Sequence, residues 1–211
     1  MPASPARPRR LLPLLAMVAV FAAPVVAAWF FYLYPQYLPA ARSNRGELIE
    51  PVVRLEAGPA FQGVEGGAFD LAALAGKWTL VELSHTPCGD GCRRHVAEMG
   101  QVWAALGESR LDVERLLLLT GAVAEEGIAS ARAIAAEFPG LRVAFAGPAA
   151  IDAITVGLRG DPLGRTYIMD PFGRLMMRYA PEAPPGDVLK DMERLLKASK
   201  NWIKGAQYGH Q

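Results

Sequence analysis

The sequence predicts an α/β domain joined to one N-terminal membrane-spanning helix. Three features lead to this prediction: a long uncharged apolar segment near the start, an alternation of buried-strand and amphipathic-helix patterns after it, and a turn motif between the last two strands. Outside the apolar segment, the 211 residues leave room for about one domain. The net charge is only +1, so the chain lacks the basic surface that binds nucleic acid, and we expect no nucleic-acid partner.

The apolar segment covers residues 11–34 and contains no charged side chain. At about 1.5 Å per residue, a helix of this length exceeds the roughly 30 Å hydrocarbon thickness of a bilayer. A cleaved signal peptide is the alternative, but its apolar region would be shorter and would end in small residues. Aromatic residues instead crowd the far end, as they do at membrane interfaces: Trp29, Phe30, Phe31, Tyr32, Tyr34 and Tyr37. We therefore expect an uncleaved anchor in the lipid bilayer.

The basic residues around this segment predict its orientation. Three arginines within residues 1–10 place the N-terminus in the cytoplasm, and Arg42 and Arg45 on the other side weaken the contrast without reversing it. The prediction is a single-pass protein of the inner (cytoplasmic) membrane whose C-terminal domain lies on the periplasmic, extracytoplasmic side. In such an oxidising space a cysteine pair can form a disulfide.

The rest of the chain divides into a linker, a domain and a tail. Residues 35–67 are expected to form a juxtamembrane linker and loop, because they are rich in turn-forming residues and show little periodicity. The folded domain is expected at residues 68–199, and a C-terminal tail at residues 200–211. The predicted strands cover 78–83, 113–119, 141–145, 166–169 and 175–179, and the predicted helices 92–106, 128–138, 149–158 and 188–196.

The last two strands are expected to form a hairpin. Asp170-Pro171-Phe172-Gly173 lies between them, and Asp first, Pro second and Gly fourth suit a type I turn. The complete order is βαβαβ(α)ββα. It predicts a parallel sheet with an antiparallel hairpin at one side and helices on both faces.

The chain has two cysteines, Cys88 in the loop after the first strand and Cys92 in the first turn of the next helix. Thiols this close can exchange between dithiol and disulfide or bind a soft metal ion, and a helix N-terminus favours the thiolate. Cys92 shares the buried stripe of its helix, so we expect Cys88 to attack and Cys92 to resolve. Arg93, Arg94 and His95 could add positive charge, or form an exposed basic turn. A structural disulfide or two idle thiols is the alternative.

The chain resembles the Sco/SenC family in Thr86-Pro87-Cys88-Gly89-Asp90-Gly91-Cys92, in the flanking strand and helix, and in Tyr167-Ile168-Met169-Asp170-Pro171-Phe172-Gly173. The resemblance covers residues 76–197 and is that of a divergent relative. It implies a thioredoxin-like fold, and the membrane anchor agrees with it. It also implies a role in cytochrome c oxidase assembly, with copper bound by a Cys-x-x-x-Cys pair and a distant His.

The distant copper-ligating His of that family has no counterpart here. Aligned through Tyr167 and Pro171, it falls on Pro162, which cannot ligate a metal. His95 and His85 are the candidate substitutes, and a third histidine, His210, falls in the expected tail; a solvent-facing or satisfied histidine is the alternative for each. Cu(I) can also be held by Cys88 and Cys92 alone.

These features lead to three hypotheses. The first is a membrane-anchored assembly factor that uses Cys88 and Cys92 for thiol-disulfide exchange, copper delivery or both, with a haem-copper oxidase subunit or another redox or assembly protein as partner. The second is a general periplasmic thiol-disulfide oxidoreductase, which is the enzyme class that the cysteine pair would support. The third is a non-catalytic membrane-tethered scaffold.

Overall fold

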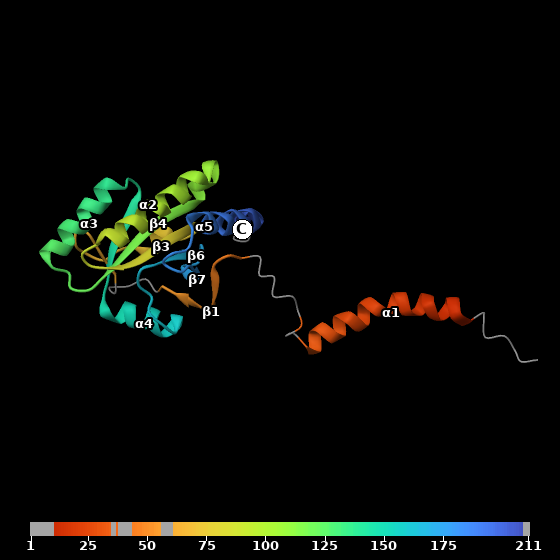
Figure 1. The fold of residues 1–211 in the computed structure, drawn as a ribbon. Coiled ribbons are helices and arrows are strands. Elements are labelled where there is room, and N and C mark those ends of the chain that lie inside the picture. The colour runs from red at the N-terminus through yellow and green to blue at the C-terminus, as the bar shows by residue number, and fades with distance from the viewer. Residues whose placement is uncertain (1–10, 35–36, 38–43, 56–60, 209–211) are drawn as a thin grey trace, which may run out of the picture. The chain divides into compact units, whose positions relative to one another are not determined.

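The computed structural model of the chain describes residues 11–34, 37, 44–55 and 61–208, with residues 11–12 and 200–208 described by their backbone alone. The chain divides into two compact units, Met1–Ser43 and Asn44–Gln211. Figure 1 shows the helix of the first unit and the α/β domain of the second.

The first unit contains helix α1 (Leu11–Leu33). Its stretch Pro13–Leu33 has a mean hydropathy of 2.4, and none of it is buried inside the protein. A helix of this length and composition can cross a bilayer, in agreement with the span predicted for residues 11–34. Pro24 lies inside the helix, which a membrane helix tolerates.

The second unit is built on a seven-stranded sheet with the order β1-β7-β6-β3-β4-β5-β2. The central strands β3, β4 and β5 are parallel, and β6 runs antiparallel to β3 and to β7. The predicted parallel sheet with an antiparallel hairpin at one side is therefore confirmed. The five predicted strands are β3 (Trp78–His85), β4 (Val113–Thr120), β5 (Leu141–Ala146), β6 (Arg165–Met169) and β7 (Arg174–Arg178).

The two edge strands lie where the sequence suggested a linker. β1 (Glu47–Arg54) pairs with β7, and β2 (Phe61–Gly63) pairs with β5. The prediction of a linker and loop over residues 35–67 is wrong for these two segments. β1 buries only every fourth residue and contains Pro51, which an edge strand tolerates because one side of its backbone has no strand partner. Its pattern therefore lacks the alternation that identifies a half-buried strand.

Helices cover both faces of the sheet (Figure 1). The helices α2 (Asp90–Ala105), α3 (Glu125–Glu137) and α5 (Pro185–Tyr208) contribute to one apolar cluster, while α4 (Pro148–Leu158) and the 3-10 helix η3 (Leu71–Leu74) contribute to the cluster on the other face. A second 3-10 helix, η4 (Gly107–Asp112), leads into β4. Helix α5 continues to Tyr208, so the predicted tail is helical for most of its length. His210 lies outside the described residues.

A turn over Asp170–Gly173 joins β6 to β7, at the place where the sequence predicts one. The amide of Gly173 donates to the carbonyl of Asp170 at 3.0 Å, and the Asp170 carboxylate accepts from the amides of Phe172 and Arg174 at 2.9 and 3.0 Å. Gly173 has a φ of +80°, which other residues rarely adopt. The turn chemistry read from the sequence is therefore the chemistry that the structure uses.

A buried carboxylate fixes the point at which the chain enters the sheet. Asp191 on α5 is 2% exposed and accepts hydrogen bonds from the amides of Arg45 and Gly46 at 2.7 and 2.8 Å and from the Tyr179 hydroxyl at 3.0 Å. Each neighbouring pair from β3 through β6 and β7 to β1 is antiparallel. The N-terminal end of β1 therefore lies at the same end of the sheet as the C-terminal end of β3.

We predict that Asp191→Asn lowers the free energy of unfolding of the full chain in detergent by about 2 kcal/mol, because the amide loses both the charge and part of the accepting capacity that hold residues 45–46. Urea unfolding followed by tryptophan fluorescence measures this. Asp187→Asn is the matched control on the same helix. It removes a half-exposed ion pair with Arg45 and one negative charge in the first turn of α5, so its cost should stay below about 1 kcal/mol. Equal losses in the two variants would contradict the anchoring role of Asp191.

Candidate redox site

The two cysteines lie where the central strand gives way to a helix. The amide of Thr86 donates to the carbonyl of Thr120 at 2.8 Å and so ties the loop after β3 to the end of β4. Helix α2 begins four residues later, with Gly89 as its N-cap. Cys88 and Cys92 form a disulfide across this boundary, with their Cα atoms 5.4 Å apart. The unpaired backbone amides at the N-terminus of α2 therefore lie at the end of the domain that carries the disulfide.

The two sulfurs differ in their surroundings. Cys92 is 6% exposed and belongs to the apolar cluster under α2, whereas Cys88 is half-buried at the margin of that cluster. Gly89 and Gly91 are exposed, and a Cβ added to either would meet no atom within 4 Å. No side chain from these two residues shields the disulfide. The expected contrast between a more accessible Cys88 and a more protected Cys92 is confirmed.

A surface hollow of about 600 Å³ opens beside Cys92. Its walls come from the end of β3, the first turns of α2, the loop just before β6 and the loop between β7 and α5. The lining residues include Ser84, His85, Cys92, Arg94, His95, Gly164 and Pro181. The sequence grouped Arg93 with Arg94 and His95 as positive charge near the sulfurs; Arg93 instead pairs with Glu137 on α3 at 3.3 Å.

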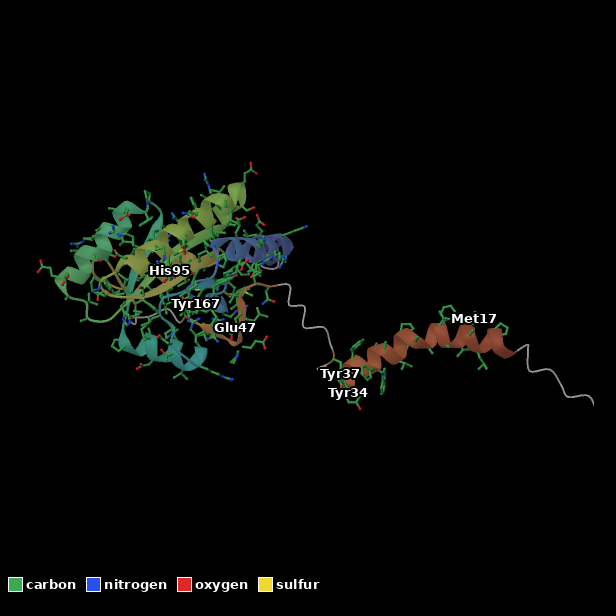
Figure 2. The ribbon with its side chains drawn as sticks, viewed as in Figure 1. Met17, Tyr34, Tyr37, Glu47, His95 and Tyr167 are labelled. Carbon is green, nitrogen blue, oxygen red and sulfur yellow. A yellow bond between two sulfur atoms is a disulfide. The ribbon has the colours of Figure 1, made fainter. Side chains whose placement is uncertain are left out.

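His95 is held by hydrogen bonds at both ring nitrogens. It projects from α2 (Figure 2) and is 7% exposed. Its Nδ1 lies 2.9 Å from Oε1 of Glu82, which is fully buried in the middle of β3, and its Nε2 lies 3.1 Å from the carbonyl oxygen of Pro181. The Thr166 hydroxyl donates to the other Glu82 oxygen at 3.1 Å. His95 is therefore the satisfied histidine that the sequence left open as an alternative.

The pKa of His95 is raised above the ordinary value of 6.5, chiefly because Glu82 accepts a hydrogen bond from the ring, although burial opposes this. A raised pKa in the folded state means that the charged ring is favoured by folding. Its contribution to stability is complete below the pKa of the unfolded chain and is lost as the pH rises through the pKa of the folded protein.

The described residues do not supply the three ligands of a Cys-Cys-His copper site. Among them, no group of three or more His, Cys, Asp or Glu side chains is placed to hold a metal ion. His95 would have to give up one of its two hydrogen bonds to ligate, and His85 is exposed on the hollow's rim. Reduction of the disulfide would free two sulfur ligands, which suit a two-coordinate Cu(I) ion but do not supply a third ligand.

Pro162 is fixed by a buried tyrosine. The Tyr167 hydroxyl, on β6 (Figure 2), donates to the Pro162 carbonyl oxygen at 2.7 Å, and burial raises the pKa of Tyr167 to about 12. The loop continues to Gly164, whose amide donates to Leu83 on β3 at 2.7 Å and which lines the hollow beside Cys92. The loop therefore lies near the disulfide, as the sequence suggested, but presents no metal ligand at position 162.

Sequence reasoning missed Glu82 and Pro181. Glu82 could have been found because it is a charged residue inside the apolar run Trp78–Leu83, and a buried carboxylate needs a partner. Pro181 accepts the hydrogen bond from His95 through its backbone carbonyl, and the identity of a side chain does not predict a backbone contact.

Comparison with known proteins agrees with this architecture. The profile of the family described as "transmembrane-like, thioredoxin-like, C-terminal domain" matches residues 78–199, which is more than half of the chain. The chain belongs to this family. None of the curated proteins matches it.

Solved structures with the same fold include three Sco proteins. Yeast Sco1 is 17% identical with a TM-score of 0.54, over 67% of this chain and 94% of that one. Arabidopsis thaliana ScoI with copper bound is 16% identical with a TM-score of 0.52, over 72% and 98%. BsSco, described with a disulfide switch and as a member of the Sco family of cytochrome c oxidase assembly proteins, is 18% identical with a TM-score of 0.51, over 70% and 95%. The thioredoxin-like fold implied by the Sco/SenC resemblance is confirmed.

We predict that, in the reduced full chain, iodoacetamide alkylates Cys88 at least about tenfold faster than it alkylates Cys92. The reason is that the buried Cys92 sulfur becomes accessible only when the structure around it opens locally. Peptide mass spectrometry at short reaction times measures the order. Unfolding in urea should make the two rates similar, which serves as the control. Faster modification of Cys92 in the folded protein would contradict the assignment of Cys88 as the accessible thiol.

Proposed function

We propose that this protein is a membrane-tethered thiol-disulfide exchange protein that acts during the maturation of a haem-copper oxidase. The observation that carries the proposal is the asymmetric disulfide: a half-buried Cys88, unshielded by the glycines beside it, is bonded to a buried Cys92 at the N-terminus of α2. A disulfide that closes so short a loop removes little chain entropy, so it is a poor staple for a domain with two apolar clusters.

The exchange would proceed through a mixed disulfide. A thiolate of the partner attacks Sγ of Cys88, the bond between the two sulfurs of this chain breaks, and its electron pair remains on Sγ of Cys92. The partner's second thiolate then attacks its own sulfur in the mixed disulfide and releases Cys88. The partner is oxidised to a disulfide, and Cys88 and Cys92 end as thiols that take up two protons. The same steps in reverse reduce a partner disulfide.

The choice of partner rests on two lines of support. BsSco is described as a member of a family of cytochrome c oxidase assembly proteins and shares the fold. In addition, the chain that follows the apolar helix enters the sheet at the end that carries the disulfide. We therefore infer a partner at the same membrane, either an oxidase subunit or another assembly protein. The orientation that the basic flank predicts would place both in the extracytoplasmic space.

Copper handling is the second candidate function. A Sco protein of the same fold is described with copper bound. In this chain the reduced Cys88 and Cys92 could accept Cu(I) as cargo between two thiolates, while His95 is committed to Glu82 and Pro181. Such binding would differ from a Cys-Cys-His site by its lower coordination number.

We predict that the full chain in detergent catalyses exchange between dithiothreitol and a small-molecule disulfide, and that Cys88→Ser abolishes this activity. Cys92→Ser should instead accumulate the mixed disulfide, because the buried sulfur that would displace the partner is missing. Non-reducing electrophoresis and mass spectrometry distinguish the two outcomes. Full function in cells of the Cys88→Ser, Cys92→Ser double variant would contradict exchange and leave the scaffold hypothesis.

We predict that the reduced full chain binds one equivalent of Cu(I), and that Cys88→Ser and Cys92→Ser each weaken this binding on the order of 100-fold or more, since each removes one of two ligands. Competition with a chromogenic Cu(I) chelator measures the affinity. His85→Gln is the control, and it should leave the affinity unchanged. Wild-type affinity equal to that of the serine variants would exclude copper carriage by this pair.

A further inference from the structure

The middle of β3 contains a carboxylate that the exchange mechanism above does not use. Glu82 is fully buried, and each of its oxygens has a hydrogen-bond partner: His95 Nδ1 lies 2.9 Å from one, and the Thr166 hydroxyl donates to the other at 3.1 Å. A buried carboxylate remains charged only when a cation and hydrogen bonds compensate for the lost water. His95, one helical turn after Cys92, supplies that cation when both of its ring nitrogens carry a hydrogen.

The hydrogen bonds of His95 define where its protons lie. The carbonyl oxygen of Pro181 can only accept, so Nε2 carries a hydrogen. When Nδ1 also carries a hydrogen, it donates to Glu82, and the ring is a cation between two acceptors. The two residues together then form a couple with a negative end at Glu82 and a positive end at His95.

The positive end of the couple lines the same hollow as the cysteine. Both Cys92 and His95 line the hollow beside the disulfide, whereas Glu82 is not among its lining residues. Residues three apart on a helix are neighbours on one face, so the ring lies about one turn from the Cys92 sulfur. An imidazolium in that position is attracted to a thiolate on Cys92 and has no comparable interaction with an uncharged disulfide.

We propose that Glu82 and His95 form a positioning couple that stabilises the Cys92 thiolate released when the disulfide opens. The inference rests on the proposed exchange function and adds its charge control. In the step that breaks the bond between the sulfurs, the electron pair moves to Cys92 Sγ, and the imidazolium of His95 compensates the new negative charge. No proton has to move in that step. The Cys92 thiolate is protonated afterwards from solvent in the hollow.

Other charged groups near His95 have weaker claims. On its own helix, Glu98 lines the hollow and acts on the ring at longer range, and Arg94 is exposed on the rim. The loop between β7 and α5 brings Glu182, β3 ends in His85, and β7 is followed by Tyr179, whose hydroxyl is committed to Asp191. No side chain in this set is hydrogen-bonded to the ring, whereas Glu82 is, so solvent screens these charges more than it screens the couple.

The test is an NMR titration of the His95 ring in the full chain in detergent micelles, oxidised and chemically reduced. If the imidazolium and the thiolate stabilise each other, the midpoint of His95 must be higher in the reduced protein than in the oxidised one. Glu82→Gln should lower the midpoint towards the ordinary value of 6.5. An identical His95 midpoint in both redox states would overturn the proposal.

A second measurement follows the sulfur itself. The rate of Cys92 alkylation in the Cys88→Ser background should rise with pH, and His95→Gln should shift this profile to higher pH because the cation is lost. His85→Gln is the matched control and should leave the profile in place. A purely structural role for His95 would change the rate without moving its dependence on pH. Failure of the exchange function would appear separately, as a lack of activity towards the small-molecule disulfide in a protein whose His95 midpoint still follows its redox state.

Discussion

The burial of β3 on both faces is the constraint on which the rest of the structure depends. Its residues Leu80, Val81 and Leu83 have no exposed surface, and the strand pairs along its full length with β4 and along most of it with β6. A strand held in this way ends at a fixed place. The loop that carries Cys88 is therefore delivered to a defined point beside the end of β4, where the Thr86 amide is already bonded to Thr120.

The same burial imposes a condition on the one charged side chain of β3. Glu82 cannot reach water, so the fold must bring it a partner, and α2 brings His95. Because α2 also carries Cys92, the residue that satisfies the carboxylate lies one helical turn from the buried cysteine and lines the same hollow. The same pair of residues, Glu82 and His95, thus compensates a buried charge and supports the redox pair. The carbonyl of Pro181 extends it to the loop that leads into α5.

The sequence allowed the central part of this fold to be predicted because its signals are local. Long apolar runs identified β3, β4 and β5, and Asp170 with Gly173 identified the hairpin turn. The edge strands could not be found in the same way, since β1 lacks a clear alternation of apolar and polar residues and gains its place only by pairing with β7, more than a hundred residues later. The two cysteines and the greater burial of Cys92 followed from spacing, whereas the contacts of His95 depend on residues 13 positions before it and 86 after it. Contacts between elements that are distant in the sequence cannot be predicted from the residue pattern of either element alone.

The central claim is that Cys88 and Cys92 form a reactive pair and not a structural staple. The most direct test is the reduction potential of the full chain, measured by equilibration with defined thiol-disulfide buffers followed by alkylation and mass spectrometry. A reactive pair should have a potential within the range of exchange proteins, about −270 to −120 mV. A potential below about −300 mV, which is typical of structural disulfides, would contradict it.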